Sequence, residues 1–416
     1  MRHFGSQTPG IASLFCGVVL IIACSDSESG PEQSAGNAGA AVGDAAGTGG
    51  TPPVTGAGGS SSSANGGTGG TLNAGGAAGA LNAGLGGTGT DPAAPAEPGV
   101  RFVGRVDTRD AAGARFAWSG TGVVARFSGT SLGVRLGGNQ QYSVLVDGAL
   151  QPKFVSTGGS DALATDLTAG EHVVEIYRRT EASQGVSQFL GFDIGGGELL
   201  APPPAPERRI EIIGDSVSAG YGDEGTLPCG FTADTENHYL TYGAIAARAL
   251  DAELSTVAWS GKGIVYNYDT DVVDPMPALY GRTLPQDPSS TYDFATVPDV
   301  VVINLGTNDF STEGDPTTEL FGSEYAKLLE RVRAAYPEAF ILCTVGPLLS
   351  GADLVAARAG IAAGVAAFEA AGGSNVRAWE MNVPNGNPPG CDYHPNLATH
   401  QAMADALVPE LEAHFD

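Results

Sequence analysis

The sequence predicts two folded domains: an all-β jelly roll or sandwich, followed by an α/β domain with a parallel sheet. Residues 100–197 hold short alternating apolar runs separated by Gly-containing turns, which is typical of an all-β domain. From residue 208 onward, apolar β-branched runs alternate with helical patterns, which indicates a parallel sheet covered by helices on both faces. Most of the stretch before residue 100 has too few large apolar side chains to form a core.

Residues 25–98 of that stretch are predicted to form a flexible tether. Of the 62 Gly in the chain, 21 lie in residues 31–100, among many Ala, Ser and Thr and without any Lys or Arg. Such a composition cannot offset the entropy lost on ordering the backbone, so we expect a disordered linker over 25–98. A glycine-rich solenoid is the alternative, but the regular apolar positions that a stacked core needs are missing.

Residues 1–24 resemble a bacterial lipoprotein signal. An apolar run over 11–22 leads into Ile21-Ile22-Ala23-Cys24. The resemblance implies cleavage before Cys24 and acylation of that residue, and hence a cell-envelope lipoprotein on the outer surface or in the periplasm. An ordinary secretory signal with an incidental Cys is the alternative, and it too places the mature protein outside the cytoplasm.

Export bears on the remaining cysteines. Cys229 and Cys391 lie in loops rich in Pro and Gly, and an oxidising compartment permits a disulfide between them. Cys343 lies in the apolar run 340–345, where we expect a buried and chemically inert core residue.

The charge balance excludes other classes of protein. The chain has 46 acidic and 20 basic side chains, a net charge of −26, which argues against nucleic-acid binding because a phosphate-binding surface needs a basic excess. The same charge fits a neutral polysaccharide and argues against polyanionic substrates. No apolar run reaches the roughly 18–20 residues of a bilayer span, so we expect membrane contact only through a lipid at Cys24.

The β domain is expected over 99–200, and the Pro-rich segment 201–207 is a short, stiff connection to the second domain. The predicted strands of the β domain are 115–119, 123–128, 131–136, 142–147, 172–178 and 188–194.

The α/β domain is expected over 208–416. Its predicted strands are 210–213, 254–259, 300–305, 340–345 and 376–381, and its predicted helices are 238–250, 323–336, 353–371 and 399–415. The run 300–305 is almost wholly apolar, which indicates a central strand buried on both faces. In such sheets, ligands bind at the carboxyl ends of the strands.

Chemistry-bearing residues fall at that edge. Ser216 follows the first predicted strand, Gly261 the second and Asn308 the central one, while His394 precedes the last helix. Taken singly, Ser216 fits a helix N-cap, Gly261 and Asn308 fit ordinary turn residues, and His394 fits a histidine at the start of a helix. Taken together, they supply a nucleophile, a base and donors for an oxyanion.

These four segments resemble, in order, the four blocks of the SGNH (GDSL-type) hydrolase superfamily, over residues 208–416. The resemblance implies a flavodoxin-like α/β/α domain in which Ser216 is the nucleophile and His394 the base. It also implies an oxyanion hole formed by the backbone N–H groups of Ser216 and Gly261 and the side-chain amide of Asn308.

A narrower resemblance includes the β domain. The phrases Gly-Lys-Gly-Ile (261–264), Leu-Gly-Thr-Asn-Asp-Phe (305–310) and Cys-Asp-Tyr-His-Pro (391–395) resemble family 2 carbohydrate esterases, which pair a jelly roll with an SGNH domain. The resemblance implies an acetyl xylan esterase-like enzyme that deacetylates xylan, glucomannan or related sugars through an acetyl-enzyme, without a metal or another cofactor. The alternatives are an esterase or lipase acting on small or lipid esters, and a non-catalytic carbohydrate-binding surface lipoprotein. The sequence carries no signal for oligomeric state.

Two features near His394 depart from the usual motifs. The superfamily pattern has an acid three residues before the base, where this chain has Cys391. We therefore expect Asp392 to be the third catalytic residue, with a backbone carbonyl orienting His394 as the alternative. The residue directly before the base is Tyr393, where the family usually has Trp. We expect Tyr393 and Tyr266 to stack on sugar rings, and plain packing is the alternative.

Overall fold

The computed structural model describes residues 99–415. The predicted signal segment at 1–24, the predicted lipidation site Cys24 and the predicted linker at 25–98 lie outside the described residues.

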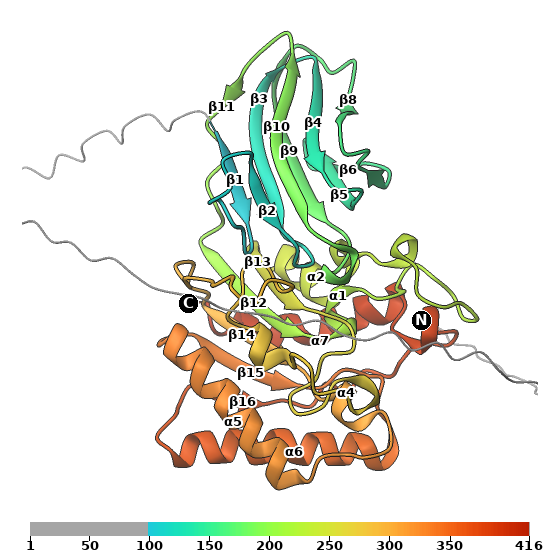
Figure 1. Ribbon diagram of the computed structural model, residues 1–416, viewed down its shortest axis with the longest axis vertical. Helices are drawn as coiled ribbons and strands as arrows, with labels where there is room; N and C mark the ends of the chain where they lie inside the picture. The colour runs from blue at the N-terminus through green and yellow to red at the C-terminus, as the bar shows by residue number, and fades with distance from the viewer. Residues whose placement is uncertain (1–98, 416) are drawn as a thin grey trace, which may run out of the picture. The chain divides into compact units, whose positions relative to one another are not determined.

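The first described domain is built from strands and turns, with one short 3-10 helix at Ala182–Gln184 (Figure 1). Its strands are β1 (Val100–Val103), β2 (Ala114–Phe116), β3 (Gly122–Gly129), β4 (Ser131–Gly137), β5 (Gln141–Val146), β6 (Ala149–Leu150), β7 (Phe154–Val155), β8 (Ser160–Ala164), β9 (Gly170–Arg178), β10 (Ser187–Gly195) and β11 (Leu199–Leu200). One sheet has the order β1-β3-β9-β5-β6, with β11 beside β3 and β7 beside β5, and the other has the order β2-β10-β4-β8. Every pairing is antiparallel.

Alternation along these strands fills the core of the sandwich. In β3, Val123, Ala125 and Phe127 are buried with Val134 and Leu136 of β4 in one apolar cluster. Side chains two residues apart point to the same face of a strand, so one face of each sheet is apolar. The predicted all-β sandwich is therefore confirmed.

The second domain has a five-stranded parallel sheet of order β13-β12-β14-β15-β16. Its strands are β12 (Arg208–Gly214), β13 (Ala252–Ala258), β14 (Val300–Asn304), β15 (Phe340–Thr344) and β16 (Val376–Ala378). Its helices are α1 (Ser216–Ala219), α2 (Tyr242–Ala249), α3 (Met276–Leu279), α4 (Thr307–Phe310), α5 (Thr318–Ala335), α6 (Gly351–Ala370) and α7 (Leu397–Glu412). The predicted parallel α/β architecture is confirmed.

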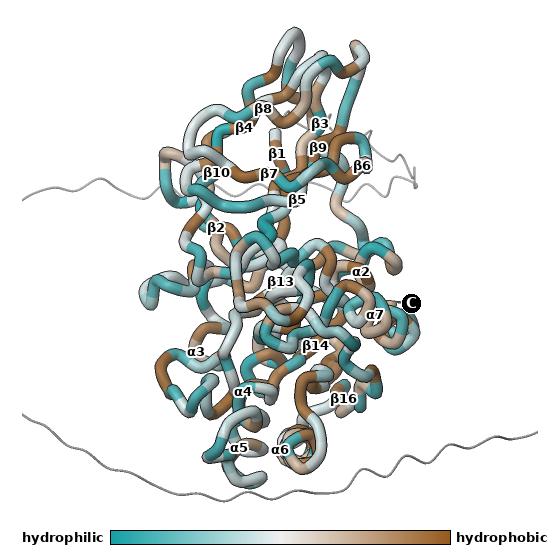
Figure 2. The backbone as a smooth tube through the Cα atoms, turned by 90° about the vertical axis from the view of Figure 1, so that its right-hand side faces the viewer, coloured by the Kyte–Doolittle hydropathy of each residue, from teal (hydrophilic) through white to brown (hydrophobic). Residues whose placement is uncertain are grey.

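Strand β14 is buried on both faces, as predicted. Val300 and Val302 pack with residues of α2 and α7 on one face. Val301 and Ile303 pack with residues of α5 and α6 on the other, where Cys343 is also buried as a free thiol. Helices α5 and α6 lie side by side beneath the sheet (Figure 2).

Helix α6 is long and apolar enough, by length and composition, to resemble a membrane span. In the structure it is a packing helix, because Ile361 and Phe368 enter the core beneath the sheet. Two glycines bring α6 close to α5: a Cβ on Gly360 would lie 2.6 Å from the Phe321 ring, and one on Gly364 would lie 2.8 Å from Tyr325 Cβ. One side of α6 is therefore in the core, while other apolar side chains of the helix lie at the surface, such as Val355, which is 68 % exposed.

A fully buried arginine joins the two domains. Arg105 of the sandwich places its Nη2 3.1 Å from Oε2 of Glu211 in β12. Tyr280 and Tyr336 also donate their hydroxyls to this carboxylate, at 2.9 and 3.2 Å. The guanidinium lies over the Tyr292 ring, 4.3 Å from its centroid. The buried charges are thus paired and hydrogen-bonded, as burial of an ion pair requires.

Candidate active site

The carboxyl edge of the parallel sheet brings the four predicted segments together. Ser216 begins α1 directly after β12, and the Asp215 carboxylate caps this short helix by accepting from Val217 N at 3.0 Å. Gly261 lies in the turn after β13, and Asn308 lies in α4 after β14. His394 follows a short 3-10 turn at Cys391–Tyr393. Parallel strands end at one edge, which explains the convergence.

The serine and the histidine are in direct contact. His394 Nε2 lies 2.8 Å from Ser216 Oγ, within reach for proton transfer. Ser216 is only 4 % exposed. Burial lowers the pKa of His394 below its ordinary value of 6.5, and the backbone carbonyl of Asp392 opposes this shift. The imidazole is therefore held in its neutral, proton-accepting form at neutral pH.

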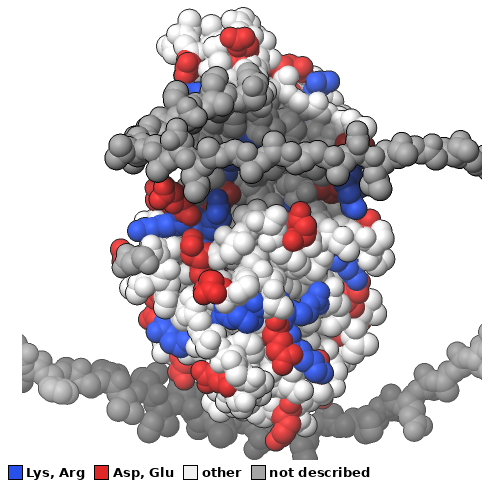
Figure 3. Space-filling model, turned by 90° about the vertical axis from the view of Figure 1, so that its left-hand side faces the viewer, with Lys and Arg blue, Asp and Glu red and all other residues white. Residues whose placement is uncertain are grey.

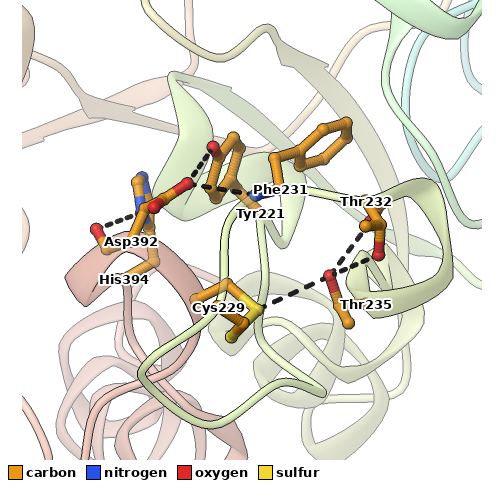
Figure 4. The surroundings of a disulfide bond; sticks show 8 residues. Tyr221, Cys229, Phe231, Thr232, Thr235, Asp392 and His394 are labelled. Carbon is orange, nitrogen blue, oxygen red and sulfur yellow. Dashed lines mark hydrogen bonds between the residues drawn. A yellow bond between two sulfur atoms is a disulfide. The ribbon is translucent and has the colours of Figure 1, made fainter.

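The partner of the other ring nitrogen of His394 is not the Asp392 carboxylate that the predicted triad requires. His394 Nδ1 lies 3.1 Å from the backbone carbonyl of Asp392. The Asp392 carboxylate instead accepts from Tyr221 Oη at 2.7 Å and from Phe231 N at 3.1 Å (Figure 4). Asp392 and Tyr393 have φ values of 48° and 65°, a turn that aims the carbonyl at the imidazole and the carboxylate elsewhere. The arrangement is a Ser–His dyad oriented by a carbonyl.

Tyr221 packs against the imidazole of His394. Its ring centroid lies 4.2 Å from that of His394, at an interplanar angle of 31°, and Phe231 packs on Tyr221 at 4.6 Å. The Asp392 carboxylate thus affects His394 indirectly, because it holds the Tyr221 ring that packs against the imidazole. The sequence analysis singled out neither Tyr221 nor Phe231, because neither lies in a motif that reveals its role.

A disulfide fixes the loop before His394. Cys229 and Cys391 form a disulfide across 162 residues of sequence. The disulfide joins the loop that carries His394 to the segment after α1 (Figure 4). Gly225 leaves room for the bridge, because a Cβ there would lie 2.1 Å from Cys391 Sγ. The disulfide that the sequence permitted is present.

The predicted oxyanion donors have different surroundings. Ser216 N–H begins α1 and so has no intrahelical acceptor. Among the described residues, no protein acceptor is found for the N–H of Ser216 or of Gly261. Gly261 has a φ of +78°, a conformation that favours glycine. Asn308 Nδ2 donates to the carbonyl of Lys262 at 3.0 Å, which anchors this amide to the turn that carries Gly261.

Two buried aspartates support this edge. Asp309 accepts three backbone N–H groups, from Ile264 at 2.9 Å, Val265 at 2.7 Å and Tyr266 at 2.9 Å. Burial raises the pKa of Asp309, and these three donors oppose the shift. Burial likewise raises the pKa of Asp215 to about 7. The sequence analysis missed the positioning role of Asp309, although it directly follows Asn308.

Exposed aromatic side chains lie near the dyad. Tyr393 is 66 % exposed, whereas the predicted sugar-stacking residue Tyr266 is half-buried and its backbone is held by Asp309. Tyr268, which the sequence analysis did not single out, is 59 % exposed, and its N–H donates to the Gly261 carbonyl at 2.8 Å. Tyr268 therefore adds a second exposed ring beside the oxyanion turn.

Within the described region, the possible metal ligands do not cluster, and charges of both signs are mixed on the face drawn in Figure 3. Within residues 99–415, no group of three or more His, Cys, Asp or Glu side chains is placed to hold a metal ion. On the face drawn in Figure 3, basic side chains lie intermixed with acidic ones. A polyanion would need a continuous basic surface instead.

Comparison with known proteins places both domains in one family. The model of the carbohydrate esterase 2 N-terminal domain matches residues 102–204, and that of the GDSL-like lipase/acylhydrolase family matches residues 212–402. A family two carbohydrate esterase from Clostridium thermocellum, solved with cellohexaose, is 40 % identical, with a TM-score of 0.72 over 76 % of this chain and 98 % of that one. The chain belongs to carbohydrate esterase family 2.

Other relatives agree with this assignment. A family 2 enzyme from Corynascus thermopiles is 34 % identical, with a TM-score of 0.69 over 76 % of this chain and 99 % of that one. The cellulase/esterase CelE of Acetivibrio thermocellus is 42 % identical over 76 % of this chain, but this family 2 chain covers only 39 % of CelE. An acetylxylan esterase/glucomannan deacetylase of Cellvibrio japonicus is 27 % identical over 79 % of this chain and 92 % of that protein.

Proposed function

We propose that this chain is a serine esterase that removes O-acetyl groups from polysaccharides or oligosaccharides such as xylan or glucomannan. The 2.8 Å contact between His394 Nε2 and Ser216 Oγ carries the proposal. It is supported by a relative named acetylxylan esterase/glucomannan deacetylase and by a relative solved with cellohexaose. The exposed ring of Tyr393 beside the dyad offers a surface on which a sugar ring can pack.

Acylation follows from the geometry of the dyad. His394 Nε2 takes the proton from Ser216 Oγ as this oxygen attacks the acetyl carbonyl carbon. The resulting imidazolium keeps its Nδ1–H on the Asp392 carbonyl. The N–H groups of Ser216 and Gly261 and the amide of Asn308 donate to the oxyanion, and each such donor contributes about 3 kcal/mol in oxyanion holes of this kind.

Acylation is complete when His394 gives its proton to the departing sugar oxygen, which leaves an acetyl ester on Ser216. Deacylation repeats the same proton transfers with water as the nucleophile. Water then attacks this ester while His394 takes up a water proton, and acetate departs as the proton returns to Ser216 Oγ. Each proton is accepted and returned by the same imidazole nitrogen.

Acetate release from a panel of esters tests the proposal. Wild type is expected to release acetate from acetylated xylan, glucomannan or chitooligosaccharide, and Ser216→Ala serves as the blank. Activity on p-nitrophenyl esters is expected to fall steeply with acyl length. A preference for long acyl chains would assign the site to lipid esters instead. Alanine at Tyr266 and at Tyr393 tests sugar stacking, which predicts a raised KM for acetylated oligosaccharides only.

The Asp392 carboxylate is predicted to matter little for turnover. Asp392→Asn keeps an oxygen that accepts from Tyr221 and Phe231 and leaves the backbone carbonyl in place, so kcat is expected to stay within about threefold of wild type. A carboxylate in a working triad would behave differently, because the same change costs about 10⁴-fold there. Steady-state kinetics on p-nitrophenyl acetate distinguish the two, with Tyr221→Phe as the matched control for the hydroxyl.

The pH profile is predicted to extend into mildly acidic solution. Protonation of His394 removes the base, and burial lowers its pKa below 6.5, so the acid limb of kcat/KM is expected to have its midpoint below pH 6.5. Because burial raises the pKa of Asp215 to about 7, the Asp215→Asn variant separates the two titrations. A midpoint above 6.5 in that variant would contradict the lowered pKa of His394.

We also propose that the chain is exported and anchored through a lipid on Cys24. The signal-like segment before this residue and the disulfide Cys229–Cys391 support export, because disulfides persist in oxidising compartments. Incorporation of labelled palmitate in wild type and its loss in Cys24→Ala are expected. Equal labelling of both proteins would contradict the anchor.

A further inference from the structure

The turn that carries Gly261 is held from outside its own domain. Ser260 N donates to Glu181 Oε2 at 2.7 Å. Glu181 belongs to the β-sandwich, three residues after the end of β9 and directly before a short 3-10 turn at Ala182–Gln184. The neighbouring Trp259 packs in a small apolar cluster with Ala182. The sandwich therefore touches the oxyanion turn through one polar and one apolar contact.

The direction of the Glu181 side chain is itself fixed. Its backbone N–H donates to Glu236 Oε1 at 3.0 Å, and its carbonyl accepts from Arg178 Nη2 at 2.9 Å. Ser183 Oγ donates to the second carboxylate oxygen at 2.6 Å. Glu181 is 4 % exposed and the guanidinium of Arg178 is fully buried. These contacts hold the Glu181 carboxylate in an orientation that faces Ser260 N–H.

We infer that Glu181 is a positioning residue for the oxyanion hole, which acts by holding the peptide before Ser260 so that Gly261 N–H stays aimed at the developing oxyanion. The inference rests on the proposed function of this site. Oxyanion donors accelerate the reaction only when they are preorganised. Gly261 has no side chain to restrict it and adopts a positive φ, so neighbouring contacts must fix its orientation.

The other side of the turn is anchored within the catalytic domain. The Gly261 carbonyl accepts from Tyr268 N at 2.8 Å, and the Lys262 carbonyl accepts from Asn308 Nδ2 at 3.0 Å. These bonds hold the residues from Gly261 onward. On the Ser260 side, Lys262 N closes the turn onto the Trp259 carbonyl at 3.2 Å, and Trp259 N reaches the Gly214 carbonyl at 3.4 Å. The 2.7 Å bond from Ser260 N to Glu181 is the shortest of these and is the one that comes from the sandwich.

Three variants of the full chain separate positioning from charge. Glu181→Ala is expected to lower kcat on p-nitrophenyl acetate about 10- to 100-fold, with KM within about threefold, because the oxyanion forms only after binding. Glu181→Asp keeps the charge but withdraws the oxygens by one methylene, so a loss of about 10-fold or more is expected. Glu181→Gln keeps an oxygen that can accept from Ser260 N–H, and we expect it to restore kcat to within about threefold of wild type.

Glu224→Gln is the matched control. Glu224, in the loop after α1, forms an ion pair with Arg179, which lies two residues before Glu181 in the sandwich. Glu224 does not touch the turn, and Gln keeps an oxygen that can accept from Arg179, so kcat is expected to stay within about threefold of wild type. A second readout is the rate at which a fluorophosphonate labels Ser216, which should fall in Glu181→Ala by the same factor as kcat/KM. Thermal unfolding of each variant verifies that it is folded.

The outcomes divide cleanly. Wild-type kcat in both Glu181→Ala and Glu181→Asp would overturn the inference, as would an equal loss in Glu224→Gln, which would assign the effect to the domain interface. If Glu181→Ala does not fold, the other two variants still test the inference. Positioning predicts a higher kcat for Glu181→Gln than for Glu181→Asp, and the reverse order would refute it. Wild type without Ser216-dependent acetate release would overturn the proposed function and this inference with it.

Discussion

Ser216→Ala and His394→Ala are each expected to lower kcat on acetylated xylan by about 10⁴- to 10⁶-fold, and the double variant is expected to lose no more than either single variant. The reason is the 2.8 Å contact between the two side chains: without the base the hydroxyl is a poor nucleophile, and without the hydroxyl the base has no proton to accept. The two residues therefore act as one unit.

Acetate release under single-turnover and steady-state conditions measures this loss. The residual activity should come from the oxyanion donors, so adding Asn308→Ala to Ser216→Ala is expected to lower it further. The Tyr393→Ala variant serves as a control for changes beside the dyad that leave the chemistry intact. Multiplicative losses in the double variant Ser216→Ala/His394→Ala would contradict a shared role.

Removing one partner of the buried ion pair is expected to cost about 3–5 kcal/mol of the free energy of unfolding. Arg105→Met leaves the Glu211 carboxylate with the hydroxyls of Tyr280 and Tyr336 but without a counter-charge. Glu211→Leu leaves the fully buried guanidinium without a counter-charge and with only the backbone carbonyls of Tyr280 and Arg282 as acceptors. It also leaves two tyrosine hydroxyls without their acceptor, so we expect it to be the more destabilising of the two changes.

Guanidinium-induced unfolding of the full chain measures both changes. The double variant Arg105→Met/Glu211→Leu removes both charges, and we expect it to be less destabilised than Glu211→Leu alone, because no unpaired charge stays buried. Arg126→Met is a matched control, since its ion pair with Glu171 is exposed and contributes about 0–1 kcal/mol. Additive losses in the double variant would show that the pair is not coupled.

The sequence predicted the strands and helices with strong patterns. The apolar run 300–305 became β14, and the Ala-rich segment 353–371 became α6. Strands β1, β6, β7, β8 and β11 were not predicted, because they are short and exposed or only partly buried and so carry little alternation. Helix α5 begins at Thr318 rather than at the predicted residue 323, since the Thr317 side chain caps it by accepting from Leu320 N.

The site was predictable where local sequence sets the position. Ser216, Gly261 and Asn308 lie at strand ends, so the topology of a parallel sheet places them together. The orientation of Asp392 was not predictable, since it depends on two backbone torsions with positive φ that the residue types do not demand. Tyr221 and Glu181 act through contacts across the fold, and a single sequence does not show which distant residues meet.

The carbonyl that orients His394 has a genetic consequence. A carboxylate can be deleted by one nucleotide change, but every residue at position 392 brings a backbone carbonyl with it. The constraint therefore falls on shape rather than on chemical identity: residues 392 and 393 must tolerate φ values of 48° and 65°, which proline, with φ locked near −65°, cannot adopt. A substitution at residue 392 therefore keeps the carbonyl that faces the imidazole, whereas the acceptor for Tyr221 Oη and Phe231 N is lost unless the new side chain also carries an oxygen that can accept.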